Sequence, residues 1–388
     1  MIGARLRQAR LAAGLSLEDL ASKLDRPISK QALSKYESNK SQPSTSTLVD
    51  LSRALGIRVS RLLSEPEVTV TWAGFRKCAA LLKSREASIT ALATQKLENE
   101  LHLRHLFHIA EQHDLPPPIP VRTFEEAENA AELVRNAWSL GGDPLPGVVE
   151  TLEDHGAVVL AWAEAPGFDG LSGWGNQNAA VVVINSAVSP DRIRFNAAHE
   201  LGHLVMNCEG ASEDEEHLAH RFAASFLVPK AAAFRELGPH RWTLSIPELG
   251  LLKQRWGLSM QAWVRRASDL GMIESSHYKF MNIEFRKRGW HRAEPYQCEF
   301  IEEPLMLRRL VWRALTEDVL SASDAQELYP GYERSNEARL QSRRYTLRDL
   351  VQLNIDERHK LMQEADVEVD LAETAEWDAV SSEELDDA

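Results

Sequence analysis

Two histidines four residues apart, with a glutamate directly after the first, are the residues of this chain best suited to chemistry. The segment reads His199-Glu200-Leu201-Gly202-His203. On a helix, positions i and i+4 share a face, so both imidazoles can reach one metal ion. Glu200 would lie beside them, where its carboxylate can take a proton from a water. The spacing indicates a zinc hydrolase with His199 and His203 as metal ligands and Glu200 as the catalytic base.

A catalytic zinc site needs a third protein ligand, because it keeps its remaining position for water. The candidates lie in an acidic run that follows the motif, Glu213-Asp214-Glu215-Glu216-His217-Leu218-Ala219-His220. This run is expected to begin a second helix that ends near residues 227–229. The spacing alone leaves open which of these side chains completes the site.

The motif needs a helix to hold it, and the preceding residues provide a start signal. Ser189 and Pro190 are typical of a helix N-terminus, so a helix is expected from there to about Met206. Residues 157–163 and 179–185 are β-branched apolar runs bounded by Gly, Pro and Asn. They predict two strands of a small sheet.

The residues between the two predicted strands, 167–176, are rich in glycine. We expect a loop there. It lacks the Lys-Ser/Thr of a phosphate-binding loop, which argues against a nucleotide site. The edge of a hairpin beside a zinc helix has another use, because an extended peptide can pair with it as an added strand.

Helix signals also precede the strands. Thr123 and Glu126 form a capping box that opens one helix, and a second, short helix is expected over residues 145–155. The proline run at residues 116–120 cannot be helical and marks a boundary. Before it, residues 69–113 are expected to be largely helical.

The first 64 residues are basic, whereas the rest of the chain is acidic. They carry 11 Lys and Arg against 5 Asp and Glu, which leaves a net charge of −20 for the remainder. Ser16 and Ser29 are expected N-caps, and Gly14 and Gly56 are expected helix ends. Five small helices in so short a basic segment suit a helix-turn-helix domain.

The composition excludes several other classes of protein. No apolar run reaches the roughly 20 residues that cross a bilayer, and the first residues lack the apolar region of a signal peptide. The three cysteines, Cys78, Cys208 and Cys298, are far apart and have no Cys-x-x-Cys spacing. They predict reduced thiols. We therefore expect a cytoplasmic protein that does not bind membranes.

The last residues, 366–388, hold ten acidic side chains and no basic one. Such a segment is expected to be a solvated, disordered tail. Its role is open between a solubilising end and an inhibitory or DNA-mimicking tail.

The basic segment resembles the XRE family of phage-repressor-like domains over its whole length. The residues that carry the resemblance are Arg10, Gly14, Leu15, Ser16, Leu20, Ala21, Ser29, Lys30, Gln31, Ser34, Lys35, Tyr36, Glu37 and Pro43. In such a fold the third helix enters the major groove of DNA. The implied DNA-binding residues are Ser29, Lys30, Gln31, Ser34 and Lys35. The resemblance also implies that Arg10 pairs with Glu37 inside the domain.

One departure from that family lies at the start of the second helix. The family usually has Gln there, and this chain has Leu17 followed by Glu18 and Asp19. A pair of carboxylates would repel phosphate. A protein-docking or dimerising module therefore stays open as the alternative to DNA binding.

Residues 124–304 resemble the ImmA/IrrE family of metallopeptidases, which have a gluzincin-like fold. The residues that carry this resemblance are Arg194, Phe195, the run Ala198-His199-Glu200-Leu201-Gly202-His203-Leu204, Glu216, Ala219, Phe222, Ala223, Ala224, Leu227, Val228 and Pro229. In that pattern, a Glu three residues before the Ala-x-x-Phe-Ala run supplies the third ligand. The resemblance therefore implies that Glu216 binds Zn²⁺ together with His199 and His203.

Two positions depart from the metallopeptidase pattern. The family often has His where Asn207 stands and Asn where His220 stands. His220 follows Glu216 by one turn, so it could be a fourth ligand, a supporting residue or a transition-state donor. Tyr278 is a second candidate donor, and His217 is expected to face solvent or to support the ligands.

Together these observations predict an α+β protein that is mostly helical. The expected order is an all-α helix-turn-helix domain (1–66), a helical linker (67–122), a gluzincin-like zinc metallopeptidase domain with a small β-sheet (123–274), a helical C-terminal region (275–365) and the acidic tail (366–388).

The expected function is that of a DNA-binding regulator with zinc-dependent endopeptidase activity. The resemblance implies a protein substrate, such as an XRE-type repressor or another regulatory protein, in a stress, mobile-element or phage-response circuit. One alternative is a non-enzymatic transcription factor whose peptidase-like domain senses a metal or a metabolite. Another is a component of a toxin–antitoxin pair with a cognate antitoxin as partner. Double-stranded DNA is the expected partner of the first domain, which commonly acts as a homodimer.

Overall fold

The computed structural model describes residues 2–73, 83–109, 113–163, 168–176 and 178–330. Residues Met1–Leu328 form one compact unit. Cys78 and all residues after 330, which include the expected acidic tail, lie outside the described residues. The α+β architecture, mostly helical with a small sheet, is confirmed. Among the described helices, none combines the length and apolar character that crossing a bilayer requires.

The first domain consists of short helices around a core of leucines. They are α1 (Ile2–Ala12), α2 (Leu17–Lys23), α3 (Lys30–Glu37), α4 (Thr45–Leu55) and α5 (Val59–Leu63). Ser16, Ser29 and Ser44 begin α2, α3 and α4, because each side chain accepts a hydrogen bond from the N–H of the third helical residue. The core residues are Leu6, Leu20, Leu24, Leu33, Leu51 and Leu62. The predicted set of small helices is confirmed.

A four-stranded mixed sheet forms the centre of the second domain. Its strands are β1 (Val70–Trp72), β3 (Val158–Trp162), β4 (Gly170–Gly175) and β5 (Ala179–Asn185), in the order β1-β4-β5-β3. β4 is antiparallel to both of its neighbours, and β3 is parallel to β5. Every residue of β5 is buried, which explains its continuous apolar sequence. The two predicted strands are confirmed as β3 and β5.

The prediction of a loop over the glycine-rich segment is wrong for residues 170–175, which form strand β4. Its backbone pairs with β5 on one side and β1 on the other. The glycines mark places where other groups come close. A Cβ at Gly175 would lie 2.7 Å from a methyl of Leu97, and one at Gly173 would lie 2.6 Å from the carbonyl oxygen of Thr71.

The segment predicted as a helical linker also differs in part. Its residues 70–72 form β1, where Val, Thr and Trp are good strand formers, so the prediction of a helix there is wrong. The helix of this segment is α6 (Lys83–Leu106). β1 is thus the edge strand of the sheet next to β4, and α6 covers one face of the sheet.

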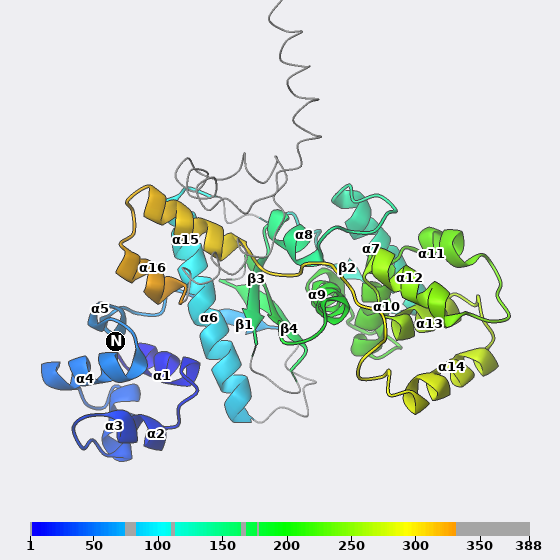
Figure 1. Ribbon diagram of the computed structural model, residues 1–388. Coiled ribbons are helices and arrows are strands. Elements are labelled where there is room, and N and C mark those ends of the chain that lie inside the picture. Colours follow the sequence, from blue (N-terminus) through cyan, green and yellow to red (C-terminus); the bar gives the residue numbers. More distant parts are fainter. Residues whose placement is uncertain (1, 74–82, 110–112, 164–167, 177, 331–388) are drawn as a thin grey trace, which may run out of the picture. The chain divides into compact units, whose positions relative to one another are not determined.

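Strand β5 separates two apolar cores, because alternate side chains of a strand point to opposite faces. Ala180, Val182 and Ile184 pack with residues of α7 (Phe124–Ala137), α8 (Val148–Asp154), α9 (Pro190–Val205) and α10 (Glu215–Leu227), whereas Ala179, Val181 and Val183 pack with residues of α6. Figure 1 shows α6 and α9 on the two sides of the sheet. The sheet is therefore covered by helices on both faces.

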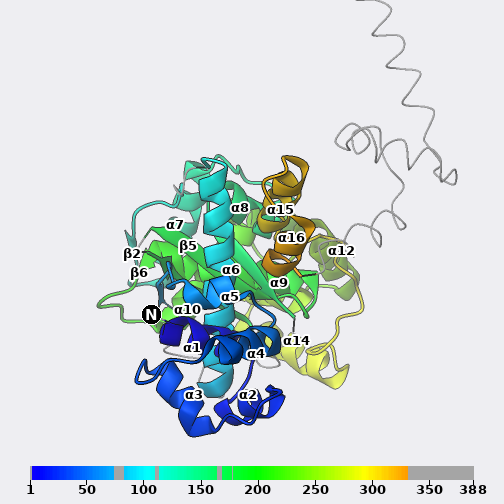
Figure 2. The same cartoon turned by 90° about the vertical axis from the view of Figure 1, so that its left-hand side faces the viewer.

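A buried ion pair joins the first domain to α6. Arg5 of α1 and Glu98 of α6 are 3% and 6% exposed, and their closest N···O distances are 2.5 and 2.6 Å. Arg5 also donates to the carbonyl oxygen of Glu65, and Glu98 accepts the N–H of Glu67. The pair thus holds both α1 and the connection into β1. Figure 2 shows α1 and α5 beside α6.

The remaining elements follow the sheet in the sequence or flank it. They are α11 (Lys230–Leu237), α12 (Ile246–Trp256), α13 (Met260–Asp269), α14 (Ser275–Lys287), α15 (Met306–Thr316), α16 (Ala322–Leu328) and the short parallel pair β2 (Ile119–Pro120) and β6 (Met206–Asn207). Residues 288–305, between α14 and α15, are named the return segment here, because they place carboxylates against α8, α12 and α13.

Candidate metal centre

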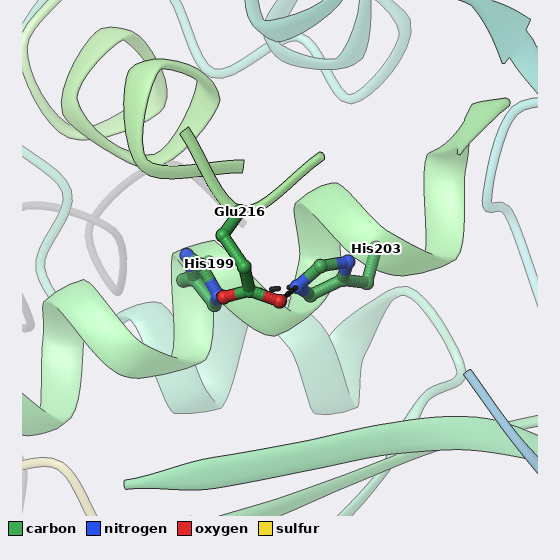
Figure 3. A group of neighbouring side chains, drawn as sticks. All are labelled: His199, His203 and Glu216. Atoms are coloured by element: carbon green, nitrogen blue, oxygen red, sulfur yellow. Dashed lines mark hydrogen bonds and ion pairs between the residues drawn. The ribbon is translucent and has the colours of Figure 1, made fainter. Parts of the chain in front are cut away.

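The two histidines of the motif and Glu216 come together from two packed helices. His199 and His203 lie one turn apart on α9, which begins at Ser189 and Pro190 as predicted. Glu216 lies in the first turn of α10, where Asp214 is the N-cap and accepts the N–H of Glu216. Figure 3 shows the three side chains pointing toward one another.

The spacing of the donor atoms in this group fits one metal ion. Nε2 of His199 and Nε2 of His203 are 3.1 Å apart, and the carboxylate oxygens of Glu216 lie 3.3 and 3.5 Å from them. In a tetrahedral zinc site with bonds of about 2.0–2.1 Å, the ligand atoms are about 3.3 Å apart. One ligand atom from each of the three side chains lies within 4.8 Å of the other two, and two imidazole nitrogens with a carboxylate are a donor set that zinc accepts.

The electrostatics of the group favour an ionised carboxylate. Hydrogen bonds from His199 and His203 hold the pKa of Glu216 far below its ordinary value, although partial burial opposes them. Burial lowers the pKa of His199 to about 4, which keeps its imidazole neutral at neutral pH. His203 differs, because burial lowers its pKa but hydrogen bonds to Glu215 and Glu216 raise it to about 10. Its imidazole is therefore protonated in the metal-free chain and has to lose that proton when it binds a metal ion.

A second carboxylate supports His203 from behind. Nδ1 of His203 lies 3.2 Å from Oε1 of Glu215. Such a partner orients a metal-binding imidazole and selects its tautomer. In the sequence, Glu215 is one of the candidate ligands in the acidic run. In the structure, the first turn of α10 points Glu216 at Nε2 of both histidines and Glu215 at Nδ1 of His203, so the two carboxylates have different roles.

Glu200 lies under strand β4, on the sheet side of α9. It is 6% exposed, and Oγ of Ser172 donates to its Oε2 at 2.7 Å. A Cβ at Gly170 would lie 2.7 Å from Oε1 of Glu200, so β4 passes directly over the carboxylate. Burial raises the pKa of Glu200 to about 7, while the Ser172 hydrogen bond opposes the shift. Sequence reasoning missed Ser172, because nothing in a glycine-rich run marks a serine as a partner of Glu200.

The other predicted site residues occupy different places. The ring of His220 lies 4.6 Å from that of His199, and its Nδ1 donates to the carbonyl oxygen of Glu216 at 2.6 Å. His217 is exposed. Tyr278 is on α14 with the guanidinium of Arg265 5.9 Å from its ring. Within the described part of the chain, the cluster of metal-ligand type holds His199, His203 and Glu216, and neither His220 nor Tyr278 belongs to it.

The N-terminal half of α9 is anchored by a buried ion pair. Arg194 is 0% exposed, and its Nη1 lies 2.5 Å from Oε1 of Glu302 in the return segment. Glu302 also accepts the N–H groups of Val148 and Val149 at the start of α8. The guanidinium of Arg194 lies over the ring of Phe300. The helix that carries the histidines is thus tied to residues more than one hundred positions later.

A second buried charge group reinforces this anchor. Nζ of Lys253 lies 3.3 Å from Oδ2 of Asp191 on α9 and 2.8 Å from Oε2 of Glu294 in the return segment. Glu294 also accepts the N–H groups of Met260 and Gln261 at the start of α13. The return segment thus packs against α9, α12 and α13 through Glu294 and Glu302.

The first domain presents its predicted DNA-contacting residues on the surface. Ser29, Lys30, Gln31, Ser34 and Lys35 are all exposed, at the start and along one side of α3. The predicted pairing of Arg10 with Glu37 is confirmed, with Nε and Oε1 2.6 Å apart. This pair fixes the last residue of α3 to α1.

The two carboxylates that depart from the repressor-like pattern have partners within the domain. Glu18 forms an ion pair with Lys30, and Asp19 accepts the N–H of Ser16 at 2.9 Å in a capping box. Pairing with a cation offsets the charge of Glu18, and the capping role explains why an acid suits position 19. The expected repulsion of phosphate is therefore weaker than the sequence indicated.

Two family models match separate regions of the chain. A family model described as helix-turn-helix matches residues 6–62, and a peptidase family model described as IrrE N-terminal-like domain matches residues 153–268. The second match includes β4, α9 and the first turn of α10, and therefore all of the residues of the cluster. No curated protein matches the chain. The chain thus joins a helix-turn-helix domain of the XRE type to an IrrE-like peptidase domain.

Proposed function

We propose that the chain is a DNA-binding regulator whose second domain is a zinc-dependent endopeptidase. The observation that carries this proposal is the convergence of His199, His203 and Glu216, with the Glu200 carboxylate one residue along the same helix. Bound at these three ligands, Zn²⁺ supplies a Lewis acid for a water and for the scissile carbonyl. The match of residues 153–268 to a peptidase family model supports the same function.

The chain itself supplies the proton transfer. Glu200 is buried beside the ligands and held by Ser172, so its carboxylate has one orientation. It takes a proton from the attacking water and passes it to the leaving amine. The Nδ1 of His220 donates to the carbonyl oxygen of Glu216, so its Nε2 is an acceptor in the neutral ring and a donor in the protonated ring. The ring lies next to that of His199, which suits a supporting role toward substrate.

The substrate class follows from the first domain and from the resemblance to ImmA/IrrE metallopeptidases. A peptidase joined to a DNA-binding domain meets proteins that act on DNA, so we infer a repressor or other regulatory protein of a stress, mobile-element or phage-response circuit. The exposure of the α3 residues supports DNA contact. A homodimer is proposed because it is the usual arrangement of this class of domain. A cognate antitoxin as substrate fits the same site.

The test is cleavage of candidate proteins encoded beside the gene, with zinc-loaded protein. We expect discrete fragments that disappear with Glu200→Gln and with a chelator. Glu213→Gln is the matched control, because Glu213 is exposed and lies outside the cluster. Its activity should equal that of the unchanged chain. Equal fragments from the Glu200→Gln variant, or intact proteins under every condition, would contradict an endopeptidase.

One observation favours the non-enzymatic alternative, a regulator with a sensing peptidase-like domain. The outer edge of β4, next to Glu200, already pairs with β1 of the same chain. A peptide cannot add to an edge that is occupied. Cleavage by the unchanged chain, at any measurable rate, decides against this alternative.

A further inference from the structure

Strand β1 covers the sheet edge that lies nearest to Glu200. It pairs antiparallel with β4 in the register Val70 to Gly175, Thr71 to Trp174 and Trp72 to Gly173. Backbone hydrogen bonds extend the pairing at both ends, from the N–H of Ala73 to the oxygen of Ser172 and from the N–H of Asn176 to the oxygen of Thr69. Five consecutive residues, 69–73, thus pair along β4.

The direction of this pairing leads toward the catalytic carboxylate. Antiparallel pairing places each later residue of β1 beside an earlier residue of β4, so Ala73 reaches Ser172. Ser172 bonds to Glu200, and Gly170, two residues earlier, lies against the same carboxylate. Any strand that pairs in this register therefore carries its following residues toward Glu200.

From this geometry we propose that β1 holds the place of the substrate strand. The proposal rests on the proposed peptidase function and names its substrate and its regulation. The substrate is an extended protein segment that exchanges with β1 on β4, and the chain with β1 in place is the inactive form. Main-chain pairing to a sheet edge would supply the affinity, and side-chain pockets would supply the selectivity.

The position of Trp72 opposite Gly173 indicates which side chain such a substrate carries. Gly173 stands opposite Trp72, and a Cβ there would lie 3.0 Å from both the Cα and the ring of Trp72. Trp72 packs against the apolar core between the sheet and α6. A glycine that leaves room for a ring on the neighbouring strand favours an aromatic residue at that position. The substrate segment therefore has an aromatic residue opposite Gly173, followed by the residues that reach Glu200.

The attachment of β1 links this edge to the first domain. Only five residues separate the last residue of α5, Leu63, from Thr69, and the connection is held by Arg5 and Glu98. Asn176 adds a side-chain hydrogen bond to the N–H of Thr69. A movement of the first domain away from α6 would pull on β1 directly. Such a connection suits a regulator in which DNA binding and peptidase activity affect each other.

The first experiment weakens β1 without touching the site. The N–H of Ala73 points to β4, and N–H groups of alternate residues of a strand point the same way, so the N–H of Thr71 does too. Thr71→Pro removes that donor, whereas Thr71→Ser keeps it and changes only an exposed side chain. With zinc-loaded protein and casein as an unfolded substrate, we expect kcat/KM to rise about tenfold for Thr71→Pro. Thr71→Ser should not change it.

The second experiment measures exchange without turnover. A fluorescent peptide of residues 67–73 should bind the Thr71→Pro variant about tenfold more tightly than the unchanged chain, by anisotropy. The same peptide with Trp72→Ala should bind more weakly. Trp72→Ala in the full chain is a second variant for both experiments. Thermal unfolding of each variant is measured as a control. If the Thr71→Pro variant does not fold, the Trp72→Ala variant still tests the proposal.

The outcomes separate this proposal from the proposed function. Equal casein cleavage by the unchanged chain and both β1 variants would overturn strand exchange while supporting the peptidase. Tighter peptide binding by the β1 variants, without cleavage by any of them, would support the exchange at this edge and overturn the peptidase. If the unchanged chain and both β1 variants bind the peptide equally, strand exchange is overturned, whether or not any of them cleaves casein.

Discussion

The two functional helices of this chain are held by the same device, a buried Arg–Glu pair, over very different distances along the sequence. In the first domain, Arg10 of α1 binds Glu37 at the end of α3, which is 27 residues away. In the second, Arg194 of α9 binds Glu302, which is 108 residues away. Each pair fixes the helix that presents the functional side chains.

The two pairs differ in how many segments of the chain each of them joins. Glu37 bonds to Arg10 alone among its described side-chain partners, and Arg10 keeps a second acceptor in the oxygen of Leu15. The single carboxylate of Glu302, in the return segment, bonds to both α9 and the start of α8. Glu302 is only 4% exposed. The small domain therefore relies on a leucine core with one added pair, whereas the site of the larger domain depends on charges brought from distant parts of the chain.

The strongest test of this comparison removes Glu302. Glu302→Ala leaves the guanidinium of Arg194 fully buried without its carboxylate, which should lower the free energy of unfolding by about 3–5 kcal/mol. Urea unfolding followed by tryptophan fluorescence reports this domain, because residues 1–64 contain no Trp. Glu299→Ala, an exposed carboxylate of the same segment, is the control and should change little. A loss below about 1 kcal/mol would mean that the pair does not anchor α9.

Glu153 extends the comparison to a buried carboxylate whose donors are backbone N–H groups. It accepts those of Leu305 and Met306 at the start of α15. Burial raises its pKa to about 7 from the ordinary 4.5; Glu100 adds to the shift, and Arg104 and the N–H donors oppose it. The folded state thus binds more protons than the unfolded state between these two values. The contribution of Glu153 to stability is complete below about pH 4.5 and falls by about 3 kcal/mol as pH rises past 7.

Glu153→Gln should remove this slope, because an amide does not titrate. The measurement is the free energy of unfolding at several pH values from 4.5 to 8, for the variant and the unchanged chain. Parallel curves for the two proteins would show that another group sets the pH dependence.

A smaller effect is expected for the pair of the first domain. Glu37→Ala should cost about 2 kcal/mol, since Arg10 keeps its bond to the oxygen of Leu15 at 2.7 Å. Amide hydrogen exchange should rise in α1 and α3 and stay unchanged in α9. Faster exchange in α9 to the same degree would show that the two domains unfold together, and the comparison between them would then fail.

The smallest effect is expected where the site helix meets the sheet. Ser172→Ala removes the hydrogen bond to Glu200, so kcat should fall about tenfold while the affinity for zinc stays the same. Zinc affinity is measured by competition with a chelator. A parallel fall in zinc affinity would mean that Ser172 supports the fold of α9, and that Glu200 is oriented by other contacts.

Much of the fold was predicted because its signals are local. Ser29 is the N-cap of α3 as expected, Thr123 and Glu126 form the predicted capping box, and residues 179–185 are strand β5. The errors came where a neighbour decides the conformation. β4 is rich in glycine and β1 is only three residues long, so neither segment has a strong strand signal over its length. β1 is a strand because β4 supplies its hydrogen bonds, and β4 is a strand because β1 and β5 supply its own.

By itself, the sequence determined which side chains could do chemistry. The spacing of His199, Glu200 and His203 on a helix follows from the period of the helix alone, and the short, capped helices of the first domain follow from adjacent residues. Only the tertiary structure decided what surrounds them. The partners of α9 and Glu200, namely Ser172, Glu215 and Glu302, and the occupation of the β4 edge by β1 depend on segments far apart in the chain. Their contacts are set by packing and hydrogen-bond satisfaction in the folded state, which no local pattern encodes.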